Sequence, residues 1–514
     1  MKFLKVLFSR FFLVAVTIIA ELLLLFFAAY SFTEYYVWVK VLTIFIGAFA
    51  ILHLLNKKQN AEYKIPWIVV ILIMPYTGLL LYLMFANPKL SRRKTKYIKE
   101  ISEKCKKVTI VSEEEDEQFK FALKKYYGME KYLRETSYMR GYLNSKSTFL
   151  KTGSIFFNDL IEELKRAQNF IFLEYFTIDN GFIWNSIHRI LKEKAAQGVE
   201  IKMIYDDMGT IGKMKAGYYK QLQKEGIKCY KFNRFTPILT AVYNNRDHRK
   251  IAVIDGRVAY TGGINLADEY ANIINPYGMW KDTAIKIEGE AVNSFTLMFL
   301  QMYVSNNRKA YKNNEQGKYQ KYFVTNSEKF NDGYAHPFGC GPLPYYKEKV
   351  GEGSLLNLIN SAQNSIYITT PYLIVDHTML LALKNAAFRG VDVRIVTPHI
   401  PDKKTIFNMT RSNYKPLMEA GVKIYEFTPG FIHSKQILVD EEIAIVGTIN
   451  LDFRSLVHHF ENGVLLYQNS CIKDIKADFE ETIRCSQLIT NENFKMSKIS
   501  QVINAMLSLI STMM

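Results

Sequence analysis

The chain has 514 residues, of which 49% are hydrophobic and 14% aromatic, so it is not an intrinsically disordered protein and is long enough for two or three domains. Its formal net charge of +17 predicts an anionic partner, either a nucleic acid or an anionic membrane surface. Five scattered cysteines without a Cys-x-x-Cys pair argue against a disulfide framework or a cysteine metal site, and favour a reducing, cytoplasm-facing compartment.

Three long apolar runs occupy the first 88 residues. They cover residues 11–32, 37–55 and 65–86, and each is close to the ~20 residues that a helix needs to cross a bilayer. We therefore expect residues 1–88 to form a multi-pass transmembrane anchor, which favours a membrane over nucleic acid as the anionic partner. A cleaved signal peptide is the alternative for the first run, but that run is long for one and contains Glu21. This carboxylate should face another helix or be protonated.

The basic residues around these runs do not fit three full spans. The N-terminus, the loop around Lys57 and the segment after residue 86 are basic, whereas the loop before Val37 has no Lys or Arg. Three full spans cannot put these three basic segments on one side, as the positive-inside rule asks. The third run is therefore either a re-entrant hairpin broken at residues 75–78 or a span that violates the rule.

Residues 89–145 are predicted to be a charged linker with helical stretches, and the soluble part then begins as a tandem repeat. Three pairs of segments recur in the same order, residues 167–171 with 362–366, 198–202 with 390–394, and 226–230 with 421–425. Each copy, residues 146–330 and 340–514, is predicted to alternate helices with strands. This pattern indicates an α/β fold with a mixed, largely parallel sheet and helices on both faces. Two copies of one unit are expected to pair by pseudo-two-fold symmetry.

One hairpin pattern occurs once in each copy. It consists of His248, Lys250, Asp255, Gly262 and Asn265 in the first copy, and of His433, Lys435, Asp440, Gly447 and Asn450, at the same offsets, in the second. The residues between Lys and Asp are mostly apolar and predict a short strand, on which His and Lys point to the same face. The Asp then turns the chain, and the Gly lets the backbone pack closely before the Asn. The nearby pair His458-His459 has no such spaced partners and is expected to face solvent.

Each hairpin thus offers one imidazole, one ammonium group and one carboxamide. One imidazole can attack a phosphorus atom while the other acts as general acid and then as general base. Histidines near their ordinary pKa of about 6.5 would suit both roles. The Lys and Asn side chains can hold the non-bridging oxygens as negative charge develops. No metal or other cofactor is required, because the ammonium groups supply positive charge. Pseudo-symmetry would bring His248 and His433 to one site.

The duplicated H-x-K-x4-D-x6-G-x2-N pattern resembles the phospholipase D superfamily, and its surroundings resemble the bacterial cardiolipin synthase family. The closer resemblance is carried by residues 245–250, 261–265, 280–283, 287–289, 370–372 and 447–455, and extends over nearly the whole chain. It implies two tandem phospholipase D-like α/β repeats that form a pseudo-two-fold catalytic body behind N-terminal transmembrane helices. It also implies transfer of a phosphatidyl group from one phosphatidylglycerol to another through a phosphohistidine. The alternative is a hydrolytic phospholipase D or another phosphatidyltransferase.

The resemblance implies roles for four acids. Asp255 and Asp440 belong to the catalytic motif, although their position at the hairpin turn favours a structural contribution to it. Asp282 and Glu461 follow the Asn of each copy and precede a predicted strand, and in the family this position supports the histidine. The implied protein acts on anionic phospholipid at the cell membrane, with its catalytic domain in the cytoplasm, and binds neither nucleic acid nor metal. Either histidine could be the nucleophile.

Overall fold

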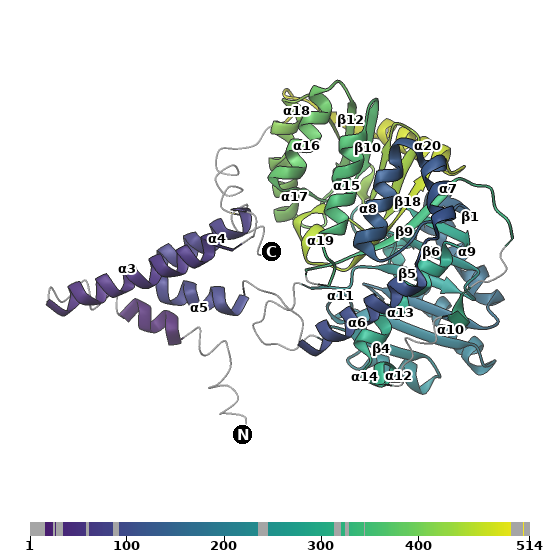
Figure 1. Cartoon of the computed structure of the whole chain (residues 1–514), viewed down its shortest axis with the longest axis horizontal. Helices are drawn as coiled ribbons and strands as arrows, with labels where there is room; N and C mark the ends of the chain where they lie inside the picture. The colour runs from purple at the N-terminus through teal and green to yellow at the C-terminus, as the bar shows by residue number, and fades with distance from the viewer. Residues whose placement is uncertain are drawn as a thin grey trace. The chain divides into compact units, whose positions relative to one another are not determined.

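The structure is a computed structural model of the chain, and it describes residues 16–23, 26, 34–57, 61–85, 92–234, 245–312, 320–323, 328–343, 345–494 and 507. The chain divides into two compact units. The helical unit contains residues 1–90 with 235–245 and 501–514, and the α/β body contains residues 91–234 and 246–500. Figure 1 shows both units and labels many of their helices and strands. Most of the first apolar run, residues 11–32, lies outside the described residues.

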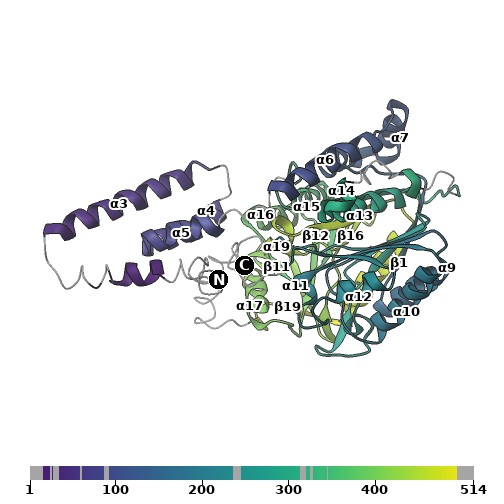
Figure 2. The ribbon, with the colours of Figure 1, turned by 90° about the horizontal axis from the view of Figure 1, so that it is seen from below.

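The helical unit contains three labelled helices, α3 (Glu34–Leu55), α4 (Ala61–Ile73) and α5 (Pro75–Phe85). The third apolar run is therefore two short helices, separated at Met74. All three helices contact one another, and α4 and α5 lie along α3 in Figure 2. A small core of buried residues joins them. Within the ranges given above, no helix combines the length and the apolar character that crossing a membrane requires.

The first half of the α/β body is a seven-stranded sheet with strand order β1-β8-β6-β5-β2-β3-β4. Its elements are, in chain order, β1 (Ser145–Leu150), α9 (Gly153–Arg166), β2 (Phe170–Tyr175), α10 (Phe182–Ala196), β3 (Glu200–Asp206), α11 (Asp207–Thr210), α12 (Tyr218–Lys224), β4 (Lys228–Phe232), β5 (Lys250–Ile254), β6 (Val258–Gly262), η3 (Asp268–Ala271), β7 (Met279–Lys281), β8 (Ala284–Gly289), α13 (Val292–Asn306) and α14 (Arg308–Lys312). Alternate residues of β2 face opposite sides of this sheet. Ile171 and Leu173 pack in the core that contains α9 and α10, whereas Phe172 stacks on Phe299 of α13.

The second half is an eight-stranded sheet with strand order β19-β13-β12-β10-β15-β16-β18-β9. Its elements are β9 (Tyr334–Cys340), α15 (Val350–Ser361), β10 (Ser365–Thr369), β11 (Leu373–Ile374), α16 (His377–Phe388), β12 (Asp392–Pro398), α17 (Lys404–Ser412), α18 (Tyr414–Met418), β13 (Lys423–Phe427), β14 (Gly430–Ile432), β15 (Gln436–Val439), β16 (Ile443–Gly447), β17 (Leu451–Asp452), α19 (Phe453–Val457), β18 (Glu461–Tyr467), α20 (Ile472–Arg484) and β19 (Ser486–Ile489).

The two sheets repeat one topology, as the sequence predicts. The order β8-β6-β5-β2-β3-β4 of the first half matches β18-β16-β15-β10-β12-β13 of the second, and β1 and β9 occupy equivalent edges. The halves meet where β16 contacts β6 and β8, and where β7 pairs in parallel with β14. The expectation of a largely parallel sheet is wrong, because within the seven- and eight-stranded sheets parallel pairing is confined to β2-β3-β4 and β10-β12-β13. The hairpin that carries each motif inserts beside β2 or β10 and adds antiparallel pairs. The predicted repeat boundaries, residues 146–330 and 340–514, remain predictions.

The segment predicted as a charged linker, residues 89–145, forms helices that pack on the α/β body. These are α6 (Arg92–Val108), α7 (Glu113–Leu123), η1 (Lys124–Tyr126) and α8 (Tyr127–Ser137). Helix α6 lies against α13 of the first half, and α8 lies against α15 and β9 of the second half. Ile101, Leu123 and Leu133 are fully buried there. The composition of this segment favours a linker because its apolar residues are spaced among many charged ones.

Two equivalent carboxylates fix the turn of each motif hairpin. Asp255 and Asp440 have positive φ angles of 53° and 50°, which the short polar Asp side chain tolerates in a turn. Asp255 accepts hydrogen bonds from the backbone N–H groups of residues 168–170, at 2.7–2.8 Å. Asp440 accepts from those of residues 363–365, at 2.7–3.1 Å. Each Asp therefore ties its hairpin to the loop that leads into β2 or β10.

We predict that Asp440→Ala destabilises the α/β body by about 2–4 kcal/mol, because three backbone N–H groups lose a charged acceptor. Thermal unfolding of the detergent-solubilised chain, followed by circular dichroism, measures the change. The exposed residue Glu114 provides the control variant Glu114→Ala, which should leave the unfolding midpoint within error. An Asp440→Ala chain that unfolds at the wild-type temperature would contradict the anchoring role.

Candidate active site

Each motif histidine is bound to the half of the α/β body that it does not belong to. The backbone N–H of His248 donates to the carbonyl of Phe460, at 2.9 Å, and the N–H of His433 donates to the carbonyl of Lys281, at 2.7 Å. Phe460 and Lys281 directly precede the two acids that sequence analysis singled out. The pseudo-two-fold relation between the halves therefore holds at the level of single hydrogen bonds.

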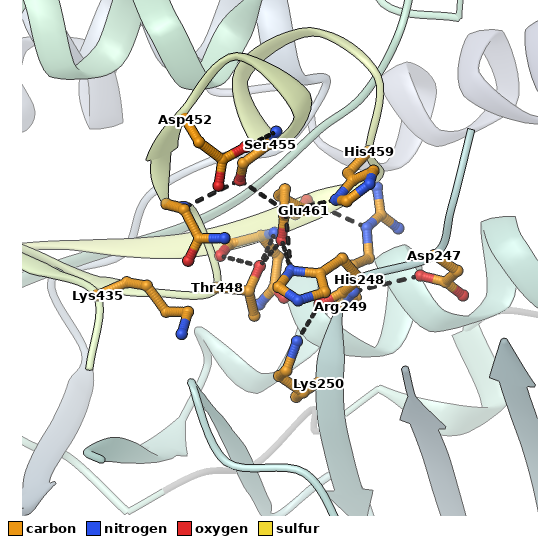
Figure 3. A network of polar contacts seen from close by, with 12 residues as sticks. Asp247, His248, Arg249, Lys250, Lys435, Thr448, Asp452, Ser455, His459 and Glu461 are labelled. Atoms are coloured by element: carbon orange, nitrogen blue, oxygen red, sulfur yellow. Dashed lines mark hydrogen bonds and ion pairs between the residues drawn. The ribbon is translucent and has the colours of Figure 1, made fainter. Parts of the chain in front are cut away.

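The same exchange occurs between the side chains. His248 Nδ1 lies 2.8 Å from Glu461 Oε2 and 2.9 Å from its Oε1, and His433 Nδ1 lies 2.7 Å from Asp282 Oδ2. Both acids are fully buried, and each faces one imidazole from the other half of the chain. A carboxylate at Nδ1 holds the proton on that nitrogen and leaves Nε2 with its lone pair free for attack or proton transfer. Figure 3 shows the His248 pair with its polar neighbours.

Glycine in each motif leaves room for these acids. A Cβ atom on Gly263 would lie 2.1 Å from Asp282 Oδ1, and one on Gly447 would lie 2.3 Å from the Asn462 carbonyl. Gly262 is also confined, since its Cβ would lie 2.3 Å from the Thr283 carbonyl at a φ of 154°. The predicted close packing before each Asn is therefore confirmed, and it is what lets the strand with the acid approach the hairpin.

Several residues that sequence analysis missed hold Glu461 in place. Thr448 Oγ1 donates to Glu461 Oε2 at 2.5 Å, and Ser455 Oγ donates to Oε1 at 2.7 Å. Arg249, between the motif His and Lys, is fully buried and donates from Nε to the Glu461 carbonyl at 3.2 Å. By contrast, the hydrogen bonds that Asp282 accepts come from His433 and, at 2.8 Å, from the Thr283 N–H. The sequence does contain a signal for Thr448, because the first motif has glycine, Gly263, at the equivalent position.

The two motif lysines are buried and point back at their own histidines. Lys250 Nζ donates to the His248 carbonyl at 2.6 Å, and Lys435 Nζ donates to the His433 carbonyl. Burial lowers the pKa of Lys250 to about 8 and that of Lys435 to about 7, against the opposing effect of the acids. The charge of Lys250 acts on His433 and that of Glu461 acts on Lys435, so both motifs contribute to one electrostatic site. Figure 3 draws Lys250, Lys435 and His248 within this network.

Both imidazoles are neutral in this site at pH 7. Burial lowers the pKa of His248 to about 3, although Glu461 raises it, and burial together with Lys435 lowers the pKa of His433 to about 4. This differs from the expected pKa near 6.5, because the sequence did not show how completely the pair would be enclosed. Burial would raise the pKa values of the two acids, but the neighbouring imidazoles outweigh it and lower the pKa values of Glu461 and Asp282. The resulting state has two carboxylates and two neutral imidazoles, ready to act as nucleophile or base.

The two motif asparagines are both buried but have different surroundings. Asn265 Oδ1 accepts from the Thr177 N–H at 3.0 Å, and its Nδ2 donates to the Tyr270 hydroxyl at 2.6 Å. Asn450 is held through its backbone N–H, which donates to Ser455 Oγ at 2.9 Å, while its side-chain oxygen has no hydrogen-bond partner. Asn450 thus has the carboxamide that is open to a ligand, and Asn265 would have to exchange its contacts to bind one.

His459 lies beside the His248 pair, contrary to the expectation that it faces solvent. Its ring is 5.4 Å from that of His248, and its Nδ1 is 3.5 Å from Glu461 Oε1. Potential ligand atoms of these three residues lie within 4.8 Å of one another, the one such group among the described residues. Imidazole and carboxylate would suit a transition metal such as zinc. However, the Glu461 oxygens already accept hydrogen bonds from His248, Thr448 and Ser455.

The repeated sheet and the paired His–Lys hairpins define a phospholipase D-like protein, and comparison with known proteins narrows this class. The family described as "Cardiolipin synthase, PLD-like domain" matches residues 160–285 and 355–483, and "Phospholipase_D-nuclease N-terminal" matches residues 45–87. The chain is 34% identical to a cardiolipin synthase of Alkalihalophilus pseudofirmus over 88% of each chain. It is 42% identical to an uncharacterized protein of Streptococcus mutans, over 88% of this chain and 96% of that one. The chain therefore belongs to the cardiolipin synthase family.

A solved structure has the same fold. A phosphatidylserine synthase of Haemophilus influenzae superposes with a TM-score of 0.55 and 15% sequence identity, over 75% of this chain and 97% of that one. At this identity the likeness concerns the architecture of the two paired halves.

We predict that each acid controls the histidine of the other half. Glu461→Gln removes the negative charge at His248 Nδ1 and should change the ¹⁵N and proton resonances of that imidazole while leaving those of His433 in place. Asp282→Asn should do the reverse, so each variant is the control for the other. Each should lower turnover at least 100-fold, as loss of the orienting carboxylate does in catalytic triads. A Glu461→Gln chain in which the His433 resonances move and those of His248 do not would contradict the crossed arrangement.

Proposed function

We propose that this chain is a cardiolipin synthase, which transfers a phosphatidyl group from one phosphatidylglycerol to a second and releases glycerol. The observation that carries the proposal is the pair of crossed histidine–carboxylate contacts with two buried lysines in one site. Two such imidazoles suit a reaction in which one phosphodiester bond is broken and another is formed at the same phosphorus. The chain's membership of the cardiolipin synthase family supports the choice of lipid.

In the first half-reaction, Nε2 of one histidine attacks the phosphorus of phosphatidylglycerol. The phosphorus–oxygen bond to the headgroup glycerol breaks, and the second imidazole, in its protonated form, gives its proton to the departing oxygen. Both imidazoles are neutral in the free site, but an anionic phosphodiester favours the protonated form of a nearby imidazole. The products are free glycerol and a phosphatidyl group bound to the nucleophilic histidine.

In the second half-reaction, the imidazole that gave its proton is now a base. It takes the proton from a headgroup hydroxyl of a second phosphatidylglycerol, whose oxygen attacks the phosphohistidine phosphorus. The phosphorus–nitrogen bond breaks, cardiolipin is released and the nucleophilic histidine is restored. Glu461 and Asp282 stabilise the positive charge that each imidazole carries in turn.

The remaining motif residues have supporting roles in this scheme. Lys250 and Lys435 in their ammonium forms, with the Asn450 carboxamide and, after a change of partners, that of Asn265, hold the non-bridging oxygens. Asp255 and Asp440 act at a distance, because their hydrogen bonds are to backbone N–H groups at the far end of each strand. They keep the hairpins in register for the histidines.

Phosphatidylglycerol is an anionic membrane lipid, so the enzyme works at a bilayer. We infer that the apolar N-terminal region attaches the chain to the cell membrane and that the α/β body faces the cytoplasm. The high net charge of +17 suits such an anionic surface. A multi-pass attachment stays a prediction of the sequence.

The scheme predicts that His248→Ala and His433→Ala each abolish cardiolipin formation, because each step needs both imidazoles. Purified chain is incubated with phosphatidylglycerol liposomes and the lipids are measured by mass spectrometry. His377, on α16 of the second half, provides the control variant His377→Ala, which should retain activity. Full activity in either motif variant would refute the two-histidine scheme. Phosphatidic acid as the sole wild-type product would show that water is the acceptor and that the enzyme is a hydrolytic phospholipase D.

The lysine pKa values predict an alkaline limit to kcat/KM. The ammonium forms are needed to hold the phosphate oxygens, and they are lost as pH rises through about 7 for Lys435 and about 8 for Lys250. We expect loss of the first ammonium group to lower kcat/KM by up to about tenfold per pH unit between pH 7 and 8, and loss of both to lower it by up to about a hundredfold per unit above pH 8. The bound phosphate raises the lysine pKa values, so the limit in kcat should lie at higher pH. Rates at saturating and limiting phosphatidylglycerol from pH 5 to 10 test this, and a constant kcat/KM between pH 7 and 9.5 would contradict it.

A further inference from the structure

The tip between α4 and α5 is held by a buried carboxylate from elsewhere in the helical unit. Glu21 is 5% exposed, its Oε1 accepts from the Tyr76 N–H at 3.2 Å, and its Oε2 accepts from the Thr77 N–H at 3.0 Å. These are the N–H groups of the first turn of α5, which have no partner within the helix. The residue before the helix, Met74, offers no side-chain oxygen, and Pro75 has no N–H group. Glu21 therefore performs, from a distant part of the chain, the function of a helix N-cap.

Helices α4 and α5 run back along each other from this tip. Trp67 and Tyr82, eight residues before and seven after Pro75, meet with their ring centroids 5.5 Å apart. Closer to the tip, a Cβ atom on Gly78 would lie 2.7 Å from the Val70 carbonyl and 2.8 Å from Ile71 Cα. Only glycine permits this approach of two helix backbones. The pairing on both sides of Pro75 makes the segment an antiparallel helical hairpin rather than one kinked helix.

The hairpin has the size and surface of an element that enters one leaflet. Helix α4 has 13 residues and α5 has 11, so they are about 20 Å and 17 Å long. Neither spans the ~30 Å hydrocarbon core of a bilayer, and each exceeds half of it. Leu72, Ile73 and Leu83 are each more than half exposed. Such a surface suits lipid chains and is unfavourable in water.

Charge and hydrogen bonding agree with this placement. Lys57 and Lys64 lie before or at the start of α4, and Lys89, Arg92 and Arg93 follow α5 in the sequence, so both ends of the hairpin carry the positive charge typical of the cytoplasmic side. A helix break inside hydrocarbon leaves N–H groups that lipid cannot satisfy. Glu21 satisfies two of them, and the Tyr76 hydroxyl at the tip forms a 2.6 Å hydrogen bond with Thr43 Oγ1 of α3.

We propose that α4 and α5 form a re-entrant hairpin that enters the cytoplasmic leaflet of a phospholipid bilayer, with Glu21 as the internal cap of its tip. The proposal depends on the membrane attachment proposed above and names how part of that attachment is built. It places the exposed apolar surface of the hairpin against lipid chains, with both ends of the hairpin on the cytoplasmic side. The charge conflict of three consecutive spans then disappears, because the third run returns to the side from which it entered.

Cysteine labelling of the full-length chain in cell membranes tests the topology. The background is Cys485→Ser, because Cys485 is exposed and the other four cysteines are buried. Lys57→Cys and Lys96→Cys report on the two ends, and Met74→Cys on the tip. With a membrane-impermeant maleimide, the two ends should react in inverted vesicles and not in spheroplasts, and the tip in neither. Labelling of the two ends from opposite faces would overturn the proposal, as would labelling of Met74→Cys from either face, since the tip would then lie outside the bilayer.

The cap is tested in the same assay. Glu21→Ala removes both acceptors and should increase labelling of Met74→Cys several-fold, and Glu21→Gln, which keeps one carbonyl oxygen, should give an intermediate increase. Leu22→Ala, at an exposed neighbouring position, is the matched control and should leave the tip protected. A tip that stays protected in Glu21→Ala would overturn the role of Glu21. Cardiolipin formation is measured on the same membranes: its absence with the expected labelling refutes the proposed function alone, and its presence with end labels on opposite faces refutes the hairpin alone.

Discussion

The site depends on one reciprocal interaction, in which each half of the chain supplies the carboxylate for the other half's imidazole. His248 is paired with Glu461, and His433 with Asp282. Because neither half contains a complete histidine–carboxylate pair, the chemistry exists only where the two halves are docked. The backbone bonds from each His N–H to the residue before the opposite acid hold this docking at the same place. Fold and catalysis therefore share one set of contacts, and a shift between the halves would disturb both pairs at once.

Burial makes this interaction effective. Carboxylates and imidazoles in water would exchange protons near their ordinary pKa values, but in this enclosed site the pKa values of both imidazoles and both lysines are lowered. The pKa values of the two lysines then lie close to neutral pH, and an anionic phosphodiester would shift both side chains fully to the ammonium form. The site consequently carries more positive charge with substrate bound than without it. This gain in positive charge stabilises bound phosphate, and it stabilises still more a transition state with greater negative charge on its oxygens.

Much of this arrangement could be predicted from the sequence because duplication makes spacing informative. Agreement between the two copies identified the motif hairpins and the repeated topology. The two supporting acids lie at different distances from their histidines, and their role was inferred from the family resemblance. The exchange of acids between halves could not be predicted, since spacing along the chain does not say across which interface a side chain points. The same limit applies to His459, where the first copy has Trp280, and to Arg249, where the second copy has Ser434. The helices of residues 92–137 were expected, but their packing on the α/β body was not, because their buried apolar residues are dispersed among charges.

The symmetry of the two halves does not extend to the electrostatics of the acids. Glu461 is held by Thr448 and Ser455 and lies beside His459, so its negative charge is spread over several contacts. Asp282 has fewer such contacts, and aromatic rings of Tyr270, Trp280 and Phe431 surround its imidazole partner. A carboxylate whose charge is shared stabilises an adjacent imidazolium less than one whose charge is directed at it. The two histidines are therefore not interchangeable, although the duplicated scaffold presents them in equivalent places.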